Sequence, residues 1–251
     1  MLKLFRKIRQ KLLSENKFSK YLLYAVGEIV LVVIGILIAL QINNWNDEKK
    51  DRALEIKILK EIHSNLEHDL NEIQHDISVM DSVDLASKNV IHFLKTQDKP
   101  TEAFYDDVAK IKVAPHFDPN KSGYELLVSK GVEIVLKDSL RAAISVLYES
   151  AYSYYGKYEE ERIKFKAEQI HPVLLRYFTA ATKPDSVWKS SFFINLEDYG
   201  LMKNEGVFFK LVNAVNFENH MVYDRASVTE RHIYGLKGLI EEELQSKEVN
   251  Y

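Results

Sequence analysis

One apolar run constrains this chain more than any other feature of its sequence. Residues 21–42 contain a single charged residue, Glu28, and these 22 residues would form a helix about 33 Å long, enough to cross the hydrocarbon core of a bilayer. The core helix of a soluble protein rarely stays apolar on every face over such a length. A cleaved signal peptide would need a shorter apolar region followed by a small-x-small cleavage site, which the sequence lacks. The run therefore predicts an uncleaved transmembrane helix, a signal-anchor, over residues 21–42.

The charged residues are divided unevenly between the two sides of this run. Residues 1–20 contain seven Lys or Arg and one acid, whereas residues 43–251 contain 27 Lys or Arg and 35 acids. Basic residues that flank a membrane helix stay on the cytoplasmic side. We therefore expect a cytoplasmic arm over residues 1–20 and an extracytoplasmic domain over residues 43–251. In a Gram-negative cell this describes a single-pass inner-membrane protein with a periplasmic domain.

The arm has the pattern of a helix that lies on a membrane surface. Leu2, Phe5 and Ile8 recur at helical spacing, and basic residues fill the rest of the wheel. An arm that binds nucleic acid would not need the apolar stripe, so no nucleic-acid partner is predicted. We expect contact with the anionic inner leaflet, and with the opposite interface through an aromatic ring. The membrane-surface residues are Lys3, Arg6, Lys7, Arg9, Lys11 and Trp45.

Three residues of the predicted span share one narrow stripe. At 100° per residue, Gly35 and Ala39 each fall about 20° from Glu28 on the helical wheel. A small-xxx-small pair lets another helix approach closely, and a protonated or shared Glu28 would hydrogen-bond across that contact. We therefore predict that Glu28, Gly35 and Ala39 associate with a second copy or with another membrane protein. The alternatives are a Glu28 that snorkels or protonates without a partner, and small residues without an interface.

Hydrophobic periodicity predicts that the domain after the span is all-α. Apolar side chains recur at steps of three and four residues, which predicts long helices over about 47–94, 139–180 and 204–246. Shorter helices are expected over residues 101–110 and 124–130. We therefore expect an elongated antiparallel bundle of about three long helices with short connecting helices.

Single residues define some expected helix ends. Asp138 is the expected N-cap of the second long helix, and His171-Pro172 should kink or break it. Gly131 is expected to end the helix over residues 124–130 in a left-handed conformation. Polar residues interrupt the apolar pattern of the third long helix, which weakens a strict coiled coil.

Groups of ionisable residues do not assemble into a recognisable catalytic or metal site. His68, Glu72, His75 and Asp76 have metal-like spacing on one helix, but no second copy of the Glu-x-x-His motif follows, as a di-iron bundle requires. We interpret this grouping, the neighbouring Asn65, Glu67 and Asp69, and the run Glu159-Glu160-Glu161 as solvated helix surface. The chain has no Cys, and the common hydrolase, phosphate-binding and dinucleotide-binding motifs are missing. We therefore predict no catalytic residue, no bound metal and no cofactor, and keep a metal-dependent helical enzyme as the lesser alternative.

Tyrosines are concentrated in the second long helix. Tyr148, Tyr152 and Tyr155 are spaced to lie on one face. Such a stripe either packs in the core or lines a ligand pocket between helices. Ordinary packing is the interpretation we favour.

The segment from Lys17 to Asp47, KFSKYLLYAVGEIVLVVIGILIALQINNWND, resembles the start of an uncharacterised single-pass membrane protein family of Bacteroidota, domain-of-unknown-function family 6090. The features that carry the resemblance are Gly27-Glu28 inside the span and the exit Leu40-Gln41-Ile42-Asn43-Asn44-Trp45-Asn46. A later stretch, Phe117-Asp118-Pro119 followed by Ser122-Gly123-Tyr124-Glu125-Leu126-Leu127 and Gly131, is similar to the connector of that family. The resemblance implies a membrane location and no particular activity.

The sequence as a whole predicts a membrane-anchored periplasmic helical protein. Its expected role is to bind a partner, to sense a ligand or to act as a scaffold. A structural subunit of an envelope complex is the alternative.

Overall fold

The computed structural model describes residues 18–182 and 190–248 of the chain. Two compact units, residues 1–55 and 56–251, are described separately below. In chain order the elements are α2 (Phe18–Thr96), α3 (Glu102–Ile111), α4 (Ser122–Lys130), η1 (Val132–Ile134), α5 (Asp138–Ser145), η2 (Val146–Ala151), α6 (Tyr152–Phe165), η3 (Lys166–Ile170), α7 (His171–Tyr177), β1 (Thr179–Thr182), β2 (Ser190–Phe193), α8 (Leu196–Glu205) and α9 (Val207–Glu248).

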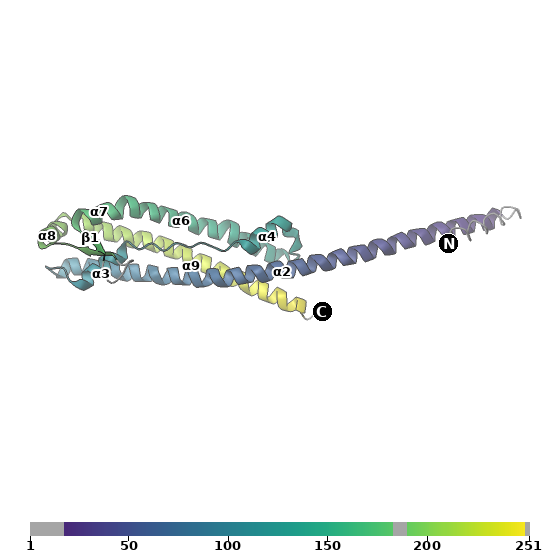
Figure 1. The fold of residues 1–251 in the computed structure, drawn as a ribbon, viewed down its shortest axis with the longest axis horizontal. Helices are drawn as coiled ribbons and strands as arrows, with labels where there is room; N and C mark the ends of the chain where they lie inside the picture. Colours follow the sequence, from purple (N-terminus) through teal and green to yellow (C-terminus); the bar gives the residue numbers. More distant parts are fainter. Residues whose placement is uncertain (1–17, 183–189, 249–251) are drawn as a thin grey trace. The chain divides into compact units, whose positions relative to one another are not determined.

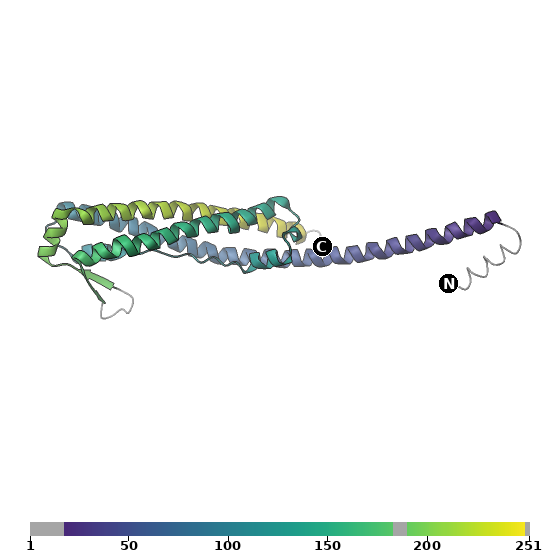
Figure 2. The same ribbon diagram turned by 90° about the horizontal axis from the view of Figure 1, so that it is seen from above.

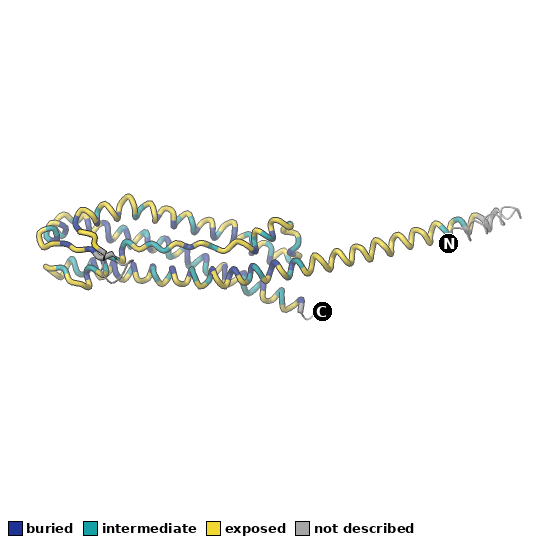
Figure 3. The backbone as a smooth tube through the Cα atoms, viewed as in Figure 1, coloured by how far each residue is buried: buried dark blue, intermediate teal, exposed yellow. Residues whose placement is uncertain are grey.

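The first unit is helical wherever it is described. Helix α2 runs without a break from the predicted span into the second unit, as the lack of Gly and Pro between Ala39 and Pro100 leads one to expect. Large apolar side chains from Leu22 to Ile42 are exposed, and the exposed stretch is unbroken from Ile29 to Ala53 (Figure 3). In the described chain, α2 is the helix long and apolar enough to cross a membrane.

Three long helical segments lie side by side in the second unit (Figures 1 and 2). They are the part of α2 from Ile56 onward, the run from α5 to α7, and α9. Polar contacts join α2 to α9 along their length: His63 to Glu241 at 2.9 Å, Gln74 to Glu230 at 3.0 Å, and the Asn219 amide to the Met80 carbonyl at 2.8 Å. Residue numbers therefore fall along α9 as they rise along α2.

The middle segment is a continuous helix with two wider turns. Residues Val146–Ala151 and Lys166–Ile170 form π-helical turns, each of which accommodates an extra residue. His171-Pro172, which was expected to kink or break this helix, does not break it, because the second π turn ends at Ile170 and Pro172 lies in the first turn of α7, where a missing N–H is tolerated. Asp138 was also wrong as an N-cap, since the cap is Lys137 and Asp138 is already helical.

Shorter elements close the two ends of the second unit. The Thr101 hydroxyl caps α3 by accepting from the Phe104 amide. Gly131 ends α4 with a positive φ of 100°, but its ψ of 126° lies outside the left-handed helical region that was expected. Gly206 does adopt that region and joins α8 to α9. The antiparallel pair of strands β1 and β2 was not predicted, because each strand is only four residues long.

The expected all-helical class with a long apolar N-terminal helix is confirmed, apart from the small β1–β2 hairpin. The start of the third long helix is corrected from residue 204 to Val207, because Gly206 separates α8 from α9.

Candidate functional site

The small-residue face of the predicted span is open along α2. Gly35 and Ala39 are exposed, and a Cβ atom added at Gly35 would meet nothing within 4 Å. Glu28 lies on the same face of α2 as Gly35 and is partly exposed. This face therefore has room for a second helix, and its association stays a prediction.

The residues that follow the apolar run form a polar segment of α2. The exposed Trp45 ring has the Lys49 amine 5.9 Å from its centre, and Asp47 accepts from Asn43 at 3.1 Å and pairs with Lys50 at 3.0 Å. Such a mixture is typical of a membrane–water boundary. The predicted arm residues Lys3, Arg6, Lys7, Arg9 and Lys11 lie outside the described residues.

The second unit contains a cluster of buried charged residues beneath an extended segment. This segment, residues 112–121 between α3 and α4, is called the connector here. The Phe117 amide donates to Glu159 Oε1 at 3.0 Å, and the Asn120 amide donates to Asp69 Oδ1 at 2.9 Å. Carboxylates of α6 and α2 thus hold the backbone of the connector from both sides.

Arg162 extends this network to the third long helix. One guanidinium nitrogen donates to the Val113 carbonyl at 2.9 Å, and the other donates to Asn219 Oδ1 at 2.7 Å. The Asn219 amide in turn donates to the Met80 carbonyl. One buried side chain therefore joins the connector, α6 and α9, and reaches α2 through Asn219.

The start of α4 docks tightly against α2. Asn65 Oδ1 accepts from the Gly123 amide at 2.9 Å and from the Ser122 hydroxyl at 3.2 Å. A Cβ atom on Gly123 would lie 2.8 Å from the Ile62 backbone nitrogen. Only glycine allows α4 to approach α2 this closely.

The predicted tyrosine stripe lies in the core beside the cluster. Tyr148, Tyr152 and Tyr155 are buried, as the packing interpretation expects. The Tyr152 hydroxyl donates to Asp69 Oδ2 at 2.6 Å, and the Phe117 ring packs against Tyr152 and Tyr155 with centroids 5.4 and 5.7 Å away. The tyrosine stripe therefore forms part of the surface against which the connector packs.

Burial shifts the ionisation of the acids in the cluster. The exposed fractions of Asp69, Glu159 and Asp76 are 0%, 2% and 4%. Desolvation raises the pKa of Asp69, against the lowering effect of its hydrogen bonds. Desolvation, followed by the charge of Glu72, raises the pKa of Asp76 to about 6, and desolvation, together with the nearby Asp76 and Glu72 charges, raises the pKa of Glu159 to about 7.

Two oxygen atoms of these acids lack a hydrogen-bond donor in the described part of the chain. Asp76 Oδ2 and Glu159 Oε2 are buried and find no hydrogen-bond donor among the described residues. The exposed His116 lies beside Glu159, with its Nδ1 3.7 Å from Oε2. An acid in this setting is suited to holding a proton near neutral pH.

The interpretation of this polar group as solvated surface was wrong for four of its residues and right for five others, while Glu72 is half-buried. Asn65, Asp69, Asp76 and Glu159 are buried, whereas Glu67, His68, His75, Glu160 and Glu161 are exposed. The available signal was spacing, since Asp69 and Asp76 each fall three or four residues from buried apolar neighbours on α2. In the part of the chain that is described, no three His, Cys, Asp or Glu side chains converge as a metal ion would require.

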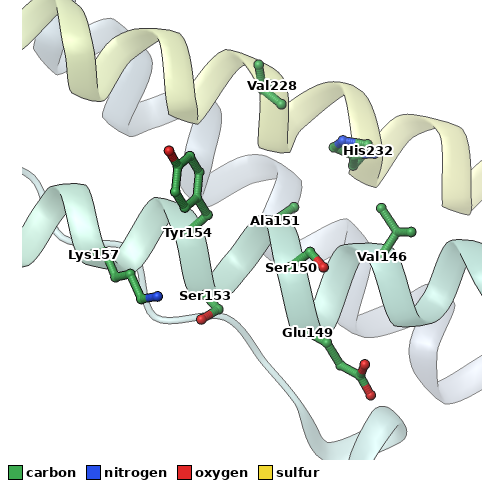
Figure 4. Close-up of a pocket in the computed structure, with 9 residues that line it drawn as sticks. All are labelled: Val146, Glu149, Ser150, Ala151, Ser153, Tyr154, Lys157, Val228 and His232. Carbon is green, nitrogen blue, oxygen red and sulfur yellow. The ribbon is translucent and has the colours of Figure 1, made fainter.

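A surface groove lies between the η2–α6 segment and α9 (Figure 4). Tyr154 points toward α9, where Val228 and His232 complete the lining, whereas Glu149, Ser153 and Lys157 point away from it. Arg225 of α9 is stacked between two rings, with its guanidinium carbon 4.8 Å from Tyr154 and 5.0 Å from Tyr158. The groove offers aromatic, apolar and basic groups to a ligand or partner.

Comparison with known proteins gives one match. The model of a protein family of unknown function matches residues 28–205, which include the connector and both π turns. No curated protein and no solved structure matches the chain.

Proposed function

The chain belongs to this family, DUF6090, and because the family has no assigned function we propose one from the geometry. We infer a single-pass inner-membrane protein whose helical domain lies in the periplasm and binds a partner or senses a ligand. No catalytic step is part of this proposal.

The exposed apolar surface of α2 carries the proposal. Every large apolar side chain from Ile29 to Ile42 is exposed, which would be costly in water at about 25 cal/mol per Å² of apolar surface. A bilayer removes that cost. The basic residues before the run and the mixed charges after it support a cytoplasmic arm and a periplasmic domain.

The contacts of the second unit support an elongated antiparallel bundle. Along the contacts between α2 and α9, residue numbers rise on α2 while they fall on α9. The contacts are His63–Glu241, Gln74–Glu230 and Met80–Asn219. A domain of this kind on a membrane anchor is suited to sensing or scaffolding, and the groove beside Tyr154 gives a ligand a place to bind.

A structural subunit of an envelope complex is the second candidate. Leu175, Leu196 and Leu201 expose large apolar surface on α7 and α8, as a subunit interface would. Chemical crosslinking in native membranes separates the two candidates. A stoichiometric protein crosslinked at these three leucines favours the subunit, and recovery of self-crosslinks alone argues against it.

Association through the span is tested by substitutions on its small-residue face. We expect Glu28→Leu and Gly35→Ile each to weaken self-association at least several-fold in a membrane two-hybrid or crosslinking assay, because the first removes a hydrogen-bonding group and the second blocks close approach. Leu37→Ala is the control, since residue 37 lies about 160° from Gly35 on the wheel. Equal association of all four proteins would refute this interface.

A further inference from the structure

The connector is held by two acids, whose charge depends on pH, and by an arginine, whose charge does not. Its backbone rests on Glu159 at Phe117, on Asp69 at Asn120 and on Arg162 at Val113. An extended segment laid across helices has no neighbouring strand, so these side chains take the place of a ladder. The strength of the attachment therefore follows the protonation of the acids beneath it.

Among the described residues, the acids beneath the connector face two histidines and a single permanently charged base, Arg162. Glu72 and His75 of α2 and His116 of the connector face Asp76, while Tyr155 and Arg162 of α6 and Asp76 itself face Glu159. From α9, Glu218 and Asn219 face Arg162. Arg162 already serves Val113 and Asn219. With Glu72, Asp76 and Glu159 all ionised, the site therefore holds a surplus of negative charge.

We propose that the connector is a proton-operated latch, closed on α2 and α6 when Asp76 and Glu159 hold protons and loosened when both acids ionise. A proton on either acid neutralises a buried oxygen that has no donor of its own. A proton on His116 acts in the same direction, because the ring lies beside Glu159 Oε2. The latch lies within the second unit, so it does not depend on whether residues 21–42 span a membrane.

The direction of the pH effect follows from linkage. Burial raises the pKa of Glu159 to about 7 and that of Asp76 to about 6, and an open connector would let water lower both toward ordinary carboxyl values. The closed state thus binds more protons than the open state. Opening releases protons, so the open fraction rises with pH between the pKa of the open state and that of the closed state, and levels off above about pH 7.

Amide hydrogen exchange of the full chain in detergent micelles tests the latch. After correction for the intrinsic pH dependence of exchange, we expect the opening constant at the Phe117 and Asn120 amides to rise roughly tenfold or more between pH 6 and pH 8.5. Amides in the middle of α9, which do not touch the connector, should change much less. Connector amides whose opening is flat across this range would overturn the proposal.

Variants assign the effect to the two acids. Asp76→Asn with Glu159→Gln removes both titrations while leaving an oxygen to accept from the Phe117 amide, so most of the pH dependence of its opening constant should be lost. Glu160→Gln, next to Glu159 but exposed, is the matched control and should retain the wild-type response. If the double variant loses helicity, Glu159→Gln alone should at least halve the logarithmic slope. An unchanged slope in the acid variants, or a slope abolished by His116→Gln, would show that these carboxyl groups do not operate the latch.

Discussion

At the scale of single residues, the buried polar groups of this protein satisfy backbone that secondary structure leaves unpaired. The connector amides of Phe117 and Asn120 have no strand partner, and carboxylates of α6 and α2 accept from them instead. An unpaired buried amide costs about 1–3 kcal/mol. The connector amides thus give buried Glu159 and Asp69 hydrogen-bond donors. The same two hydrogen bonds attach the connector to α6 and α2.

Gly123 is the residue at which this close packing is most easily tested. We expect Gly123→Ala to lower the free energy of unfolding by about 1–3 kcal/mol, because its methyl group would lie 2.8 Å from the backbone nitrogen of Ile62, which cannot rotate away. Denaturant unfolding of the full chain in micelles, followed by circular dichroism, measures the change.

Gly156→Ala is the matched control for this substitution. Gly156 lies within α6, and a Cβ atom there would meet nothing within 4 Å. Alanine at this position should be neutral or stabilise the protein by up to about 1 kcal/mol, because alanine is the better helix former. If Gly123→Ala were as stable as Gly156→Ala, α4 would not pack on α2 as described.

At the scale of elements, the buried positions of the long helices follow a regular spacing that includes polar residues. On α2 the buried residues at steps of four and three are Ile62, Leu66, Asp69, Ile73, Asp76, Met80 and Val83. On α9 they are Phe208, Val212, Val215, Asn219, Val222, Ala226, Thr229, Ile233, Leu236 and Ile240. Three of the four polar members, Asp69, Asp76 and Asn219, belong to the candidate site, and the fourth is Thr229.

This spacing explains what the sequence could and could not predict. The positions of the long helices were predictable because most members of each series are apolar. The acids of the site were missed because Asp69 and Asp76 look like surface residues by type, although their spacing is that of core residues. Nothing local indicates that residues 112–121 cross the helices, because their partners Asp69 and Glu159 lie about 40 to 50 positions away in the chain.

The π turn η2 marks one extra residue in the middle segment. Leu147 and Tyr148 are adjacent and both buried, which a regular helix does not allow on a narrow face. Before this point the buried series is Leu140, Ile144 and Leu147, and after it the series is Tyr148, Tyr152, Tyr155, Glu159 and Arg162. Removal of one residue from η2 would merge the two series into uninterrupted steps of four and three.

We therefore expect deletion of the exposed Ser150 to change the free energy of unfolding by no more than about 1 kcal/mol, since the π turn reverts to an α turn and the downstream face keeps its direction. Deletion of the exposed Glu160 is the control. This deletion rotates Arg162 and the residues after it by about 100° relative to the residues before it. It should lower the free energy of unfolding by on the order of 4 kcal/mol, or abolish cooperative unfolding. Thermal unfolding of the two deletion variants compares them directly, and equal losses would contradict an extra residue in η2.

At the scale of the whole molecule, the distribution of charge is the property from which we propose the orientation of the chain. A net charge of -3 conceals seven basic residues and one acid in residues 1–20, and an excess of acids in residues 43–251. Bases on the cytoplasmic side resist translocation, whereas acidic residues contribute little to orientation. In the proposed topology the arm sets the direction of the span, while acids of the large domain form the buried cluster.

Because the chain contains no Cys, a single introduced thiol reports the side of the membrane on which it lies. In spheroplasts treated with a membrane-impermeant maleimide, we expect Ser129→Cys, at an exposed position of α4, to be labelled at once and Ser14→Cys to be labelled only after the membrane is permeabilised. Replacement of Lys3, Arg6, Lys7, Arg9 and Lys11 by Gln should let a fraction of the Ser14→Cys thiols become accessible from outside, because the positive-inside bias is lost. If Ser14→Cys is labelled before permeabilisation in a chain that retains its arm charges, the orientation is the reverse of the one proposed. The connector would then lie in the cytoplasm.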